Sequence, residues 1–135
     1  MSAPSSQKVF TKDQTVLRDG LIYHQDTNEL VTGIVEEFHE NGQLRIRNNF
    51  KDGKRDGKWW KEYENGKKDI QIIYKDGKRH GLYNQWYENG QKRSEGNAVG
   101  GTNRTDMVKN GKWTMWDENG KKVSERTLNY SRDYK

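Results

Sequence analysis

A four-residue pattern that ends in Glu-Asn-Gly recurs along this chain, at residues 39–42, 63–66, 87–90 and 117–120. An Asn-Gly pair between strand-like segments predicts a β-hairpin, because both residues accept the positive φ of a type I′ turn. Successive copies are 24, 24 and 30 residues apart. A turn that recurs at a nearly fixed spacing indicates a repeat array, in which each unit packs on its neighbours and the array presents a surface.

A second turn sequence alternates with the first. Lys-Asp-Gly-Lys-Arg occurs at 51–55 and 75–79, and Lys-Asn-Gly-Lys at 109–112. A further glycine precedes each Glu-Asn-Gly glycine by nine residues, at Gly33, Gly57, Gly81 and Gly111. One unit therefore consists of a strand, a KDGKRxG turn, a second strand and an ENG turn. We expect an all-β fold: an elongated single sheet of roughly ten strands, built as consecutive antiparallel hairpins.

The repeat register also predicts the division of the chain. We expect a flexible N-terminal tail at 1–13 and a repeat domain at 14–135. Within that domain we predict a capping unit at 14–42, three repeats at 43–66, 67–90 and 91–120, and a terminal strand with its tail at 121–135.

Alternation along the strands predicts which side chains form the thin core. In the first strand of two units, one face carries Leu44, Ile46, Phe50, Ile70, Ile72 and Tyr74. The opposite face, which we expect to be solvated, carries Arg45, Arg47, Asp69 and Gln71. In the second strand, two columns of mostly large residues follow the glycine, Val35/Trp59/Tyr83/Trp113 and Phe38/Glu62/Trp86/Trp116. Their odd spacing predicts a bulged or strongly twisted strand, with both columns packed in the core.

Composition restricts the class of protein. Apolar residues make up only 29% and charged residues 33%, which approaches the disordered class. The regular spacing of glycines and aromatics instead favours a thin repeat fold. The chain has no cysteine, which excludes disulfides, thiolate metal sites and cysteine nucleophiles.

Charge is divided unevenly along the chain. Residues 1–42 carry three basic and seven acidic residues, for a net charge of −4, whereas residues 43–135 have a net charge of +9. This favours an acidic partner or an anionic surface for the repeats. The alternative is that Lys and Arg are solvated residues that prevent sheet aggregation.

Three sequence segments carry a family resemblance: GKWWKEYENGKK, GLYNQWYENGQKRSEG and GKWTMWDENGKKVSE. They resemble the variant MORN repeats (membrane occupation and recognition nexus) of bacterial proteins. The leader VLRDGLIYHQDTNELVTGIVEEFHENGQL looks like the N-terminal unit of the family of antitoxin components of YwqK-type toxin–antitoxin systems. The resemblance, over residues 16–128, implies an all-β hairpin array, no enzymatic activity, and protein binding that neutralises a toxin encoded alongside.

Residues that break a repeat column are candidates for function, because residues shared by all units hold the fold. The spacing between Gly90 and Gly120 is six residues longer than the others. The extra residues belong to a Gly-rich loop at 96–108, which is either a tolerated insertion or a partner contact. Trp60 stands in an otherwise polar column with Glu36, Asn84 and Thr114, which makes it a candidate hot spot. Alternatively, Trp60 covers the gap left by Glu62.

Ile73 similarly interrupts a polar column, between Asn49 and Asn97, and a basic row runs from Arg45 to Lys61. The candidate partner-binding residues are Trp60, Ile73, Arg45, Arg47, Lys58, Arg104, Thr105 and Asp106. Basic residues between aromatics can also bind single-stranded nucleic acid, but the aromatics follow the core columns, so we do not expect it.

The sequence gives little support for catalysis. The histidines His24, His39 and His80 show no metal-ligand spacing, and no Gly-x-Ser-x-Gly elbow is present. We expect no enzyme, no cofactor and no metal site. The N-terminal residues lack an apolar signal-peptide core, so we expect a cytoplasmic protein, or an envelope-associated one if a signal was removed.

The function we predict is a protein-binding module, an antitoxin or immunity protein that occludes the active site of a toxin with an acidic surface. Two alternatives stay open: a peripheral protein of anionic membranes, and a structural scaffold that self-associates.

Overall fold

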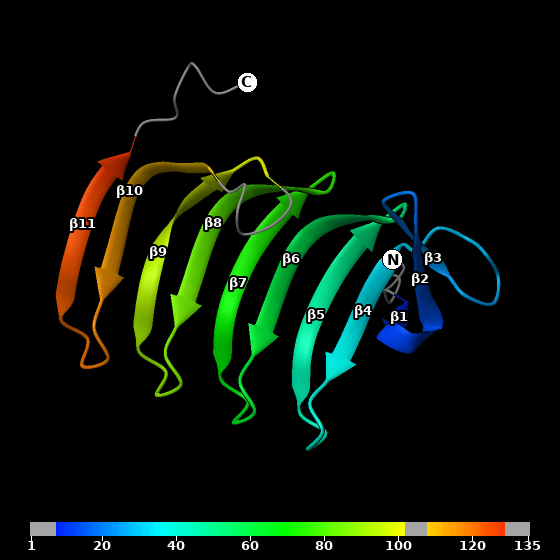
Figure 1. Cartoon of the computed structure of the whole chain (residues 1–135), viewed down its shortest axis with the longest axis horizontal. Helices are drawn as coiled ribbons and strands as arrows, with labels where there is room; N and C mark the ends of the chain where they lie inside the picture. The colour runs from blue at the N-terminus through cyan, green and yellow to red at the C-terminus, as the bar shows by residue number, and fades with distance from the viewer. Residues whose placement is uncertain (1–7, 102–107, 129–135) are drawn as a thin grey trace, which may run out of the picture.

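The computed structural model describes residues 8–101 and 108–128. Eleven strands and one short 3-10 helix lie in these residues (Figure 1). The strands are β1 (Val9–Thr11), β2 (Thr15–Arg18), β3 (Leu21–His24), β4 (Gly33–Phe38), β5 (Leu44–Lys51), β6 (Lys54–Glu62), β7 (Lys68–Lys75), β8 (Lys78–Trp86), β9 (Lys92–Val99), β10 (Val108–Trp116) and β11 (Lys122–Leu128). The helix, η1, spans Lys12–Gln14.

The predicted hairpin array is confirmed. Strands β4 to β11 follow one another in chain order across one sheet, each antiparallel to the next. Figure 1 shows this sheet as a long row of hairpins that ends at β11.

The N-terminal unit differs from the prediction. Strand β1 pairs in parallel with β4, through Val9↔Ile34 to Thr11↔Glu36, and thereby extends the sheet to nine strands. Strands β2 and β3 form a separate two-stranded sheet. The nine-stranded sheet therefore includes residues 9–11, which the sequence placed in the N-terminal tail, whereas β2 and β3 pair outside it. The repeat pattern could not place these residues, because they carry no copy of it. We call η1, β2 and β3 the cap.

The two kinds of turn have different backbones. In the Lys-Asp-Gly turns both central residues have positive φ, at 49° and 81° for Asp52-Gly53 and 51° and 84° for Asp76-Gly77, as a type I′ turn requires. In the Glu-Asn-Gly turns only the glycine has a positive φ, which is 85° at Gly66. Tyr63 O accepts from Gly66 N, and Tyr63 N donates to Lys67 O. The type I′ prediction is thus wrong for the Glu-Asn-Gly turns, which are longer loops closed by a left-handed glycine.

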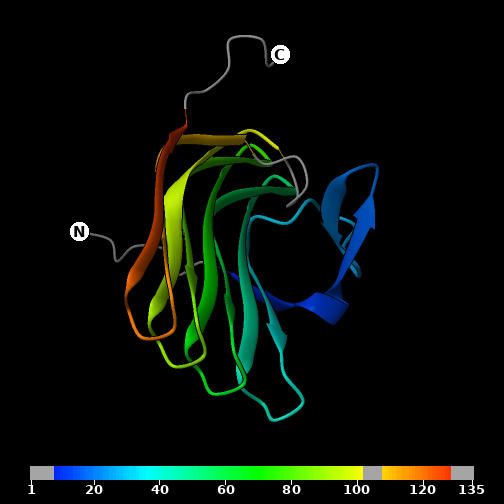
Figure 2. The ribbon, with the colours of Figure 1, turned by 60° about the vertical axis from the view of Figure 1, so that its left-hand side comes forward.

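The second glycine of each unit lies inside a strand rather than in the turn. Gly57 has φ of 106°, and the β5–β6 register changes between Asn48↔Trp59 and Phe50↔Arg55. The predicted bulge in this strand is therefore confirmed. Figure 2 shows the strands curving near their upper ends toward the side where the cap lies. We call that side of the nine-stranded sheet the inner face and the opposite side the outer face.

The core lies on the inner face in two clusters. The larger cluster contains Ile70, Ile72, Tyr74, Tyr83, Ala98 and Trp113, with Trp59 and Leu128 packed against it. The smaller one contains Val31, Val35 and Phe50, with Phe10 and Ile22 from the N-terminal residues. The predicted burial of Ile70, Ile72 and Tyr74 is confirmed. Leu44 and Ile46, also predicted core residues, are half-buried.

Side chains of the Glu-Asn-Gly turns join each unit to the next. Asn41, Asn65 and Asn89 each donate through Nδ2 to the glutamate carbonyl of the following turn, at 3.1, 3.0 and 2.8 Å. Tyr63 and Tyr87 donate to the carbonyls of Trp86 and Trp116. The repeated tetrapeptide therefore forms a ladder of hydrogen bonds from turn to turn, along the strand ends where these turns lie.

Candidate functional site

Four of the predicted partner-binding residues lie on the outer face. Register pairs Arg47 with Trp60, Trp60 with Gln71, and Lys58 with Ile73. Trp60 and Ile73 are therefore diagonal neighbours on the same face of adjacent strands, within reach of large side chains. We call Arg47, Lys58, Trp60 and Ile73 the outer patch.

Arg45 is not part of this patch. Register passes from Glu37↔Ile46 to Phe38↔Leu44, which leaves Arg45 as the extra residue of a bulge. Its guanidinium lies 3.4 Å from Glu37 Oε1, and Glu37 lines a hollow on the inner face. The predicted shared face of Arg45 and Arg47 is wrong because the bulge interrupts the alternation of side chains.

Trp60 is half-buried between charged side chains. The Arg47 guanidinium and the Lys68 ammonium lie 5.1 and 5.2 Å from its ring centroid, a cation–π arrangement. Its Nε1 donates to Glu62 Oε2 at 2.9 Å, and Arg47 also pairs with Glu36. Trp60 thus contacts Glu62 through a hydrogen bond, while its ring lies next to two cations.

Ile73 covers a bend of the neighbouring strand. The position that a Cβ would take on Gly81 lies 3.4 Å from Ile73 Cβ. In the preceding repeat Asn49 lies over Gly57 in the same way, and its Nδ2 donates to Lys58 O at 2.7 Å. Ile73 therefore replaces the polar side chain of the preceding repeat with an apolar one, and it lies diagonally beside Trp60.

Two predictions about the outer face are wrong. Asn84 and Thr114, expected to be solvated, are 5% and 8% exposed. Both side chains are short, and the register pairs Asn84 with the longer Gln71 and Glu95, and Thr114 with Glu95. The column Phe38/Glu62/Trp86/Trp116 was expected in the core, but an odd separation from the first column places it on the outer face. Phe38 is 49% exposed there, and the other three are half-buried.

The predicted loop residues Arg104, Thr105 and Asp106 lie outside the described residues. The start of their loop is anchored to the second repeat. Gly100 N donates to Arg79 O at 2.8 Å, and Arg79 N donates to Gly101 O at 3.0 Å.

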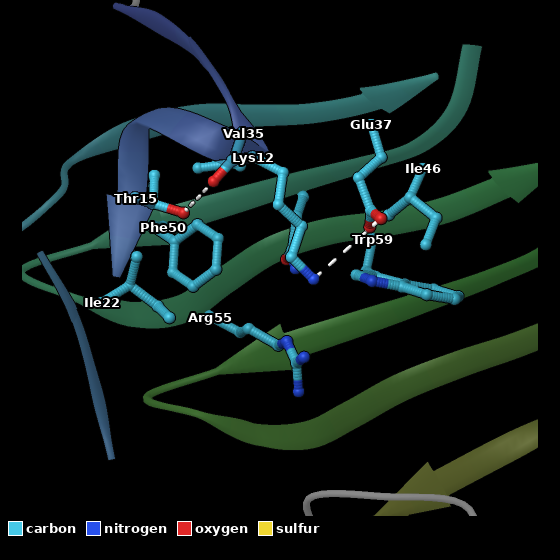
Figure 3. A pocket seen from close by; sticks show the side chains of 10 residues that line it. Lys12, Thr15, Ile22, Val35, Glu37, Ile46, Phe50, Arg55 and Trp59 are labelled. Atoms are coloured by element: carbon cyan, nitrogen blue, oxygen red, sulfur yellow. Dashed lines mark hydrogen bonds and ion pairs between the residues drawn. The ribbon is translucent and has the colours of Figure 1, made fainter. Parts of the chain in front are cut away.

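A hollow of about 280 Å³ lies between the cap and the inner face (Figure 3). It is lined by Lys12, Thr15, Ile22, Val35, Glu37, Ile46, Asn48, Phe50, Arg55 and Trp59. Figure 3 shows the Lys12 side chain reaching across the hollow toward Glu37, with Arg55 on the opposite side; Lys12 Nζ and Glu37 Oε1 are 4.0 Å apart.

A second hollow of about 270 Å³ lies at the other end of the inner face and includes Tyr83, Trp113 and Arg126. Basic side chains stack on inner-face aromatics along the array. Arg55 and Arg79 both lie over the Tyr74 ring, at 5.5 and 5.9 Å from its centroid, and Lys109 lies 4.8 Å from that of Trp113. The predicted basic row is thus divided, with Arg55 on the inner face and Arg47 and Lys58 on the outer.

The pKa values of Tyr63 and Glu125 are shifted. Burial, together with the charge and hydrogen bond of Asp69, raises the pKa of Tyr63 to about 12. A hydrogen bond from Lys122 and the nearby charge of Lys112 hold the pKa of Glu125 below its usual value. Neither group belongs to the outer patch or to the hollow beside the cap.

Within residues 8–101 and 108–128 no group of three or more His, Asp or Glu side chains is placed to hold a metal ion. The described part of the chain also contains no helix long and apolar enough to cross a membrane.

The hollow beside the cap was not predicted from the sequence. One signal was present: Asn48 occupies the position of Ile72 and Gly96 in the following units, so it is a polar exception in an inner-face column. Lys12 gave no signal, because it precedes the array and has no counterpart within the repeats.

Part of the chain matches the model of a known repeat family. The family described as the MORN repeat variant matches residues 31–52, 79–98 and 109–130. The described part of these segments covers most of three hairpins of the nine-stranded sheet, β4–β5, β8–β9 and β10–β11. No curated protein and no solved structure gave a significant match to the chain.

Proposed function

We propose, from the premise that this is a MORN-repeat protein, that it is a non-enzymatic protein-binding module that neutralises a toxin by occlusion. The observation that carries this proposal is the outer patch, where Trp60 and Ile73 are diagonal neighbours flanked by Arg47 and Lys58. Tryptophan and arginine are enriched among residues that dominate binding energy at protein interfaces.

The mechanism we propose separates anchoring from attraction. Trp60 and Ile73 would supply the apolar contact, and the basic repeats, with a net charge of +9 over residues 43–135, would attract a partner of opposite charge. A sheet face placed over the active site of such a partner would exclude its substrate. A toxin with an acidic surface fits this charge, and the protein would act in the cytoplasm.

The proposal is tested by co-expression. We expect a small reading frame adjacent to this gene to be toxic when expressed alone, and co-expression of this chain to restore growth. Trp60→Ala should abolish the rescue, whereas Trp116→Ala should preserve it. Trp116 is the matched control, since it is a half-buried outer-face tryptophan in a different repeat.

A membrane role would give a different result. The exposed Lys and Arg side chains could instead bind anionic lipid. Sedimentation with vesicles that contain anionic phospholipid, reversed by modest salt, together with no rescue by co-expression, would replace the antitoxin proposal with this one.

A further inference from the structure

The geometry points to the hollow beside the cap as a binding site for an acylated amino-acid carboxylate, that is, a carboxylate with an amide N–H next to it and an apolar side chain. This group occurs at the C-terminus of a peptide and in free N-acyl amino acids. The site lies on the inner face and does not depend on the outer patch.

Beside this hollow, two residues of its lining each have a buried polar atom without a hydrogen-bond partner. Asn48 Oδ1 is an acceptor without a donor, and Asn48 is only 9% exposed. Arg55 Nε is a donor without an acceptor. Buried polar groups in native proteins are almost always paired, and an unpaired one destabilises the fold. A ligand that offers both an N–H and an oxygen is complementary to this pair of atoms.

The hollow has room for much more than a single water. A water needs roughly 10–15 Å³ of such space, whereas this hollow measures about 280 Å³. That volume is close to the lower end of the range for small-molecule sites, about 300–1,000 Å³.

The charges around the hollow favour an anion. Glu37 is already paired with Arg45 at 3.4 Å, and its contact with Lys12 is longer, at 4.0 Å. Lys12 and Arg55 therefore leave positive charge for a ligand. Arg55 is held in place by the Tyr74 ring, 5.5 Å from its guanidinium carbon.

The walls of the hollow fit an apolar side chain. Ile22 comes from the cap, and Phe50 and Trp59 come from adjacent strands of the sheet (Figure 3). In the arrangement we infer, the carboxylate accepts from Arg55 Nε and lies near Lys12, the amide N–H donates to Asn48 Oδ1, and the side chain packs between Phe50 and Trp59.

The repeats supply an internal comparison for Asn48. The corresponding position of the next unit is Ile72, which is 5% exposed and belongs to the core. An apolar side chain is therefore compatible with the fold at this position. The carboxamide of Asn48 is unfavourable for the empty protein and becomes favourable only when a ligand supplies a donor.

The test uses the full chain and four probes: N-acetyl-leucine, N-acetyl-phenylalanine, N-acetyl-leucinamide, and an acetylated pentapeptide that ends in leucine with a free carboxylate. Binding is measured by calorimetry and by the Trp59 indole signal in 1H–15N spectra. We expect saturable binding of at least one N-acetyl amino acid or of the pentapeptide. N-acetyl-leucinamide should bind at least tenfold more weakly than N-acetyl-leucine or the pentapeptide, because it lacks the carboxylate. Tighter binding of the pentapeptide than of N-acetyl-leucine would identify a chain terminus as the source; equal binding would identify the free acid.

Variants locate the site. Asn48→Leu should reduce the affinity at least tenfold without lowering the melting temperature, and Arg55→Gln should reduce it similarly. Asn84→Leu is the matched control, since Asn84 is equally buried and its Oδ1 also lacks a partner, but it lies outside the hollow. Asn84→Leu should leave the affinity unchanged. The inference is overturned if no carboxylate probe saturates the protein, if the amide binds equally well, or if Asn48→Leu binds like the wild type.

Discussion

A single missing side chain makes room for the largest ring of the core. Gly96 lies on β9 opposite Tyr83, and a Cβ on Gly96 would overlap the indole of Trp113. That indole packs against Tyr83 at a centroid distance of 5.5 Å and donates from Nε1 to Asn97 O. The absence of a side chain at Gly96 thus leaves room for the Trp113 indole.

We therefore expect Gly96→Ala to destabilise the protein by about 1–3 kcal/mol, since it overpacks the core. Trp113→Ala should cost about 3–5 kcal/mol, because it removes a buried ring. Urea denaturation measures both free energies of unfolding. Asn97→Ala, an exposed change on the same strand, is the control and should be nearly neutral. A Gly96→Ala protein as stable as the wild type would show that the Trp113 ring does not lie over this glycine.

Trp60 provides a contrast to Trp113. It is only half-buried, so we expect Trp60→Ala to lower the melting temperature far less than Trp113→Ala does. Thermal unfolding of the two variants in parallel checks this. Unfolding of Trp60→Ala at ordinary temperature would mean that Trp60 holds the fold, and the hot-spot hypothesis would then fail.

Tyr63 should make stability depend on alkaline pH. Its pKa is raised to about 12 by burial and by Asp69. Between the ordinary tyrosine pKa and this value, the folded protein keeps the proton and the unfolded chain loses it, so stability falls as pH rises through this window. Denaturation midpoints in urea at pH 9 and pH 11 measure the loss, and Tyr63→Phe should reduce it. An equal loss in Tyr63→Phe would assign the effect to other groups.

At the scale of the element, the Glu-Asn-Gly turn has two roles. Its glycine takes the left-handed backbone of the loop, and its asparagine donates to the following turn. The sequence correctly indicated that these segments are turns, because Asn and Gly are both typical of them. It could not indicate that the asparagine acts between units, because that contact depends on the spacing of neighbouring hairpins.

The asparagine ladder can be tested at its middle and at its end. Asn65 Nδ2 donates to Glu88 O at 3.0 Å, and its Oδ1 accepts from Lys67 N at 2.9 Å. Asn65→Ala should therefore lower the free energy of unfolding by about 1 kcal/mol. Asn119 belongs to the last such turn among the described residues, so it has no following turn there to which it could donate. Asn119→Ala should therefore lower the free energy of unfolding by less than Asn65→Ala does. Equal losses in chemical denaturation would show that the donation between turns adds nothing to stability.

At the scale of the whole molecule, the repeats were predictable and their N-terminal end was not. Hairpin order, the inner-face core and the bulge at Gly57 follow from patterns that recur and so can be checked within the sequence. The pairing of β1 with β4, and the cap over the inner face, depend on residues 9–24, which occur once. The hollow beside the cap was missed for the same reason, and Arg45 was misplaced because one extra residue at a bulge changes the face of a side chain.

The central claim is that the outer patch binds a protein partner. The most direct measurement immobilises wild type, Trp60→Ala and Trp116→Ala and identifies what each retains from a lysate of the source organism. The account predicts one stoichiometric protein on wild type and on Trp116→Ala, and its absence from Trp60→Ala at equal folded content. Retention of that protein by all three, or of only lipid or nucleic acid released by modest salt, would contradict it.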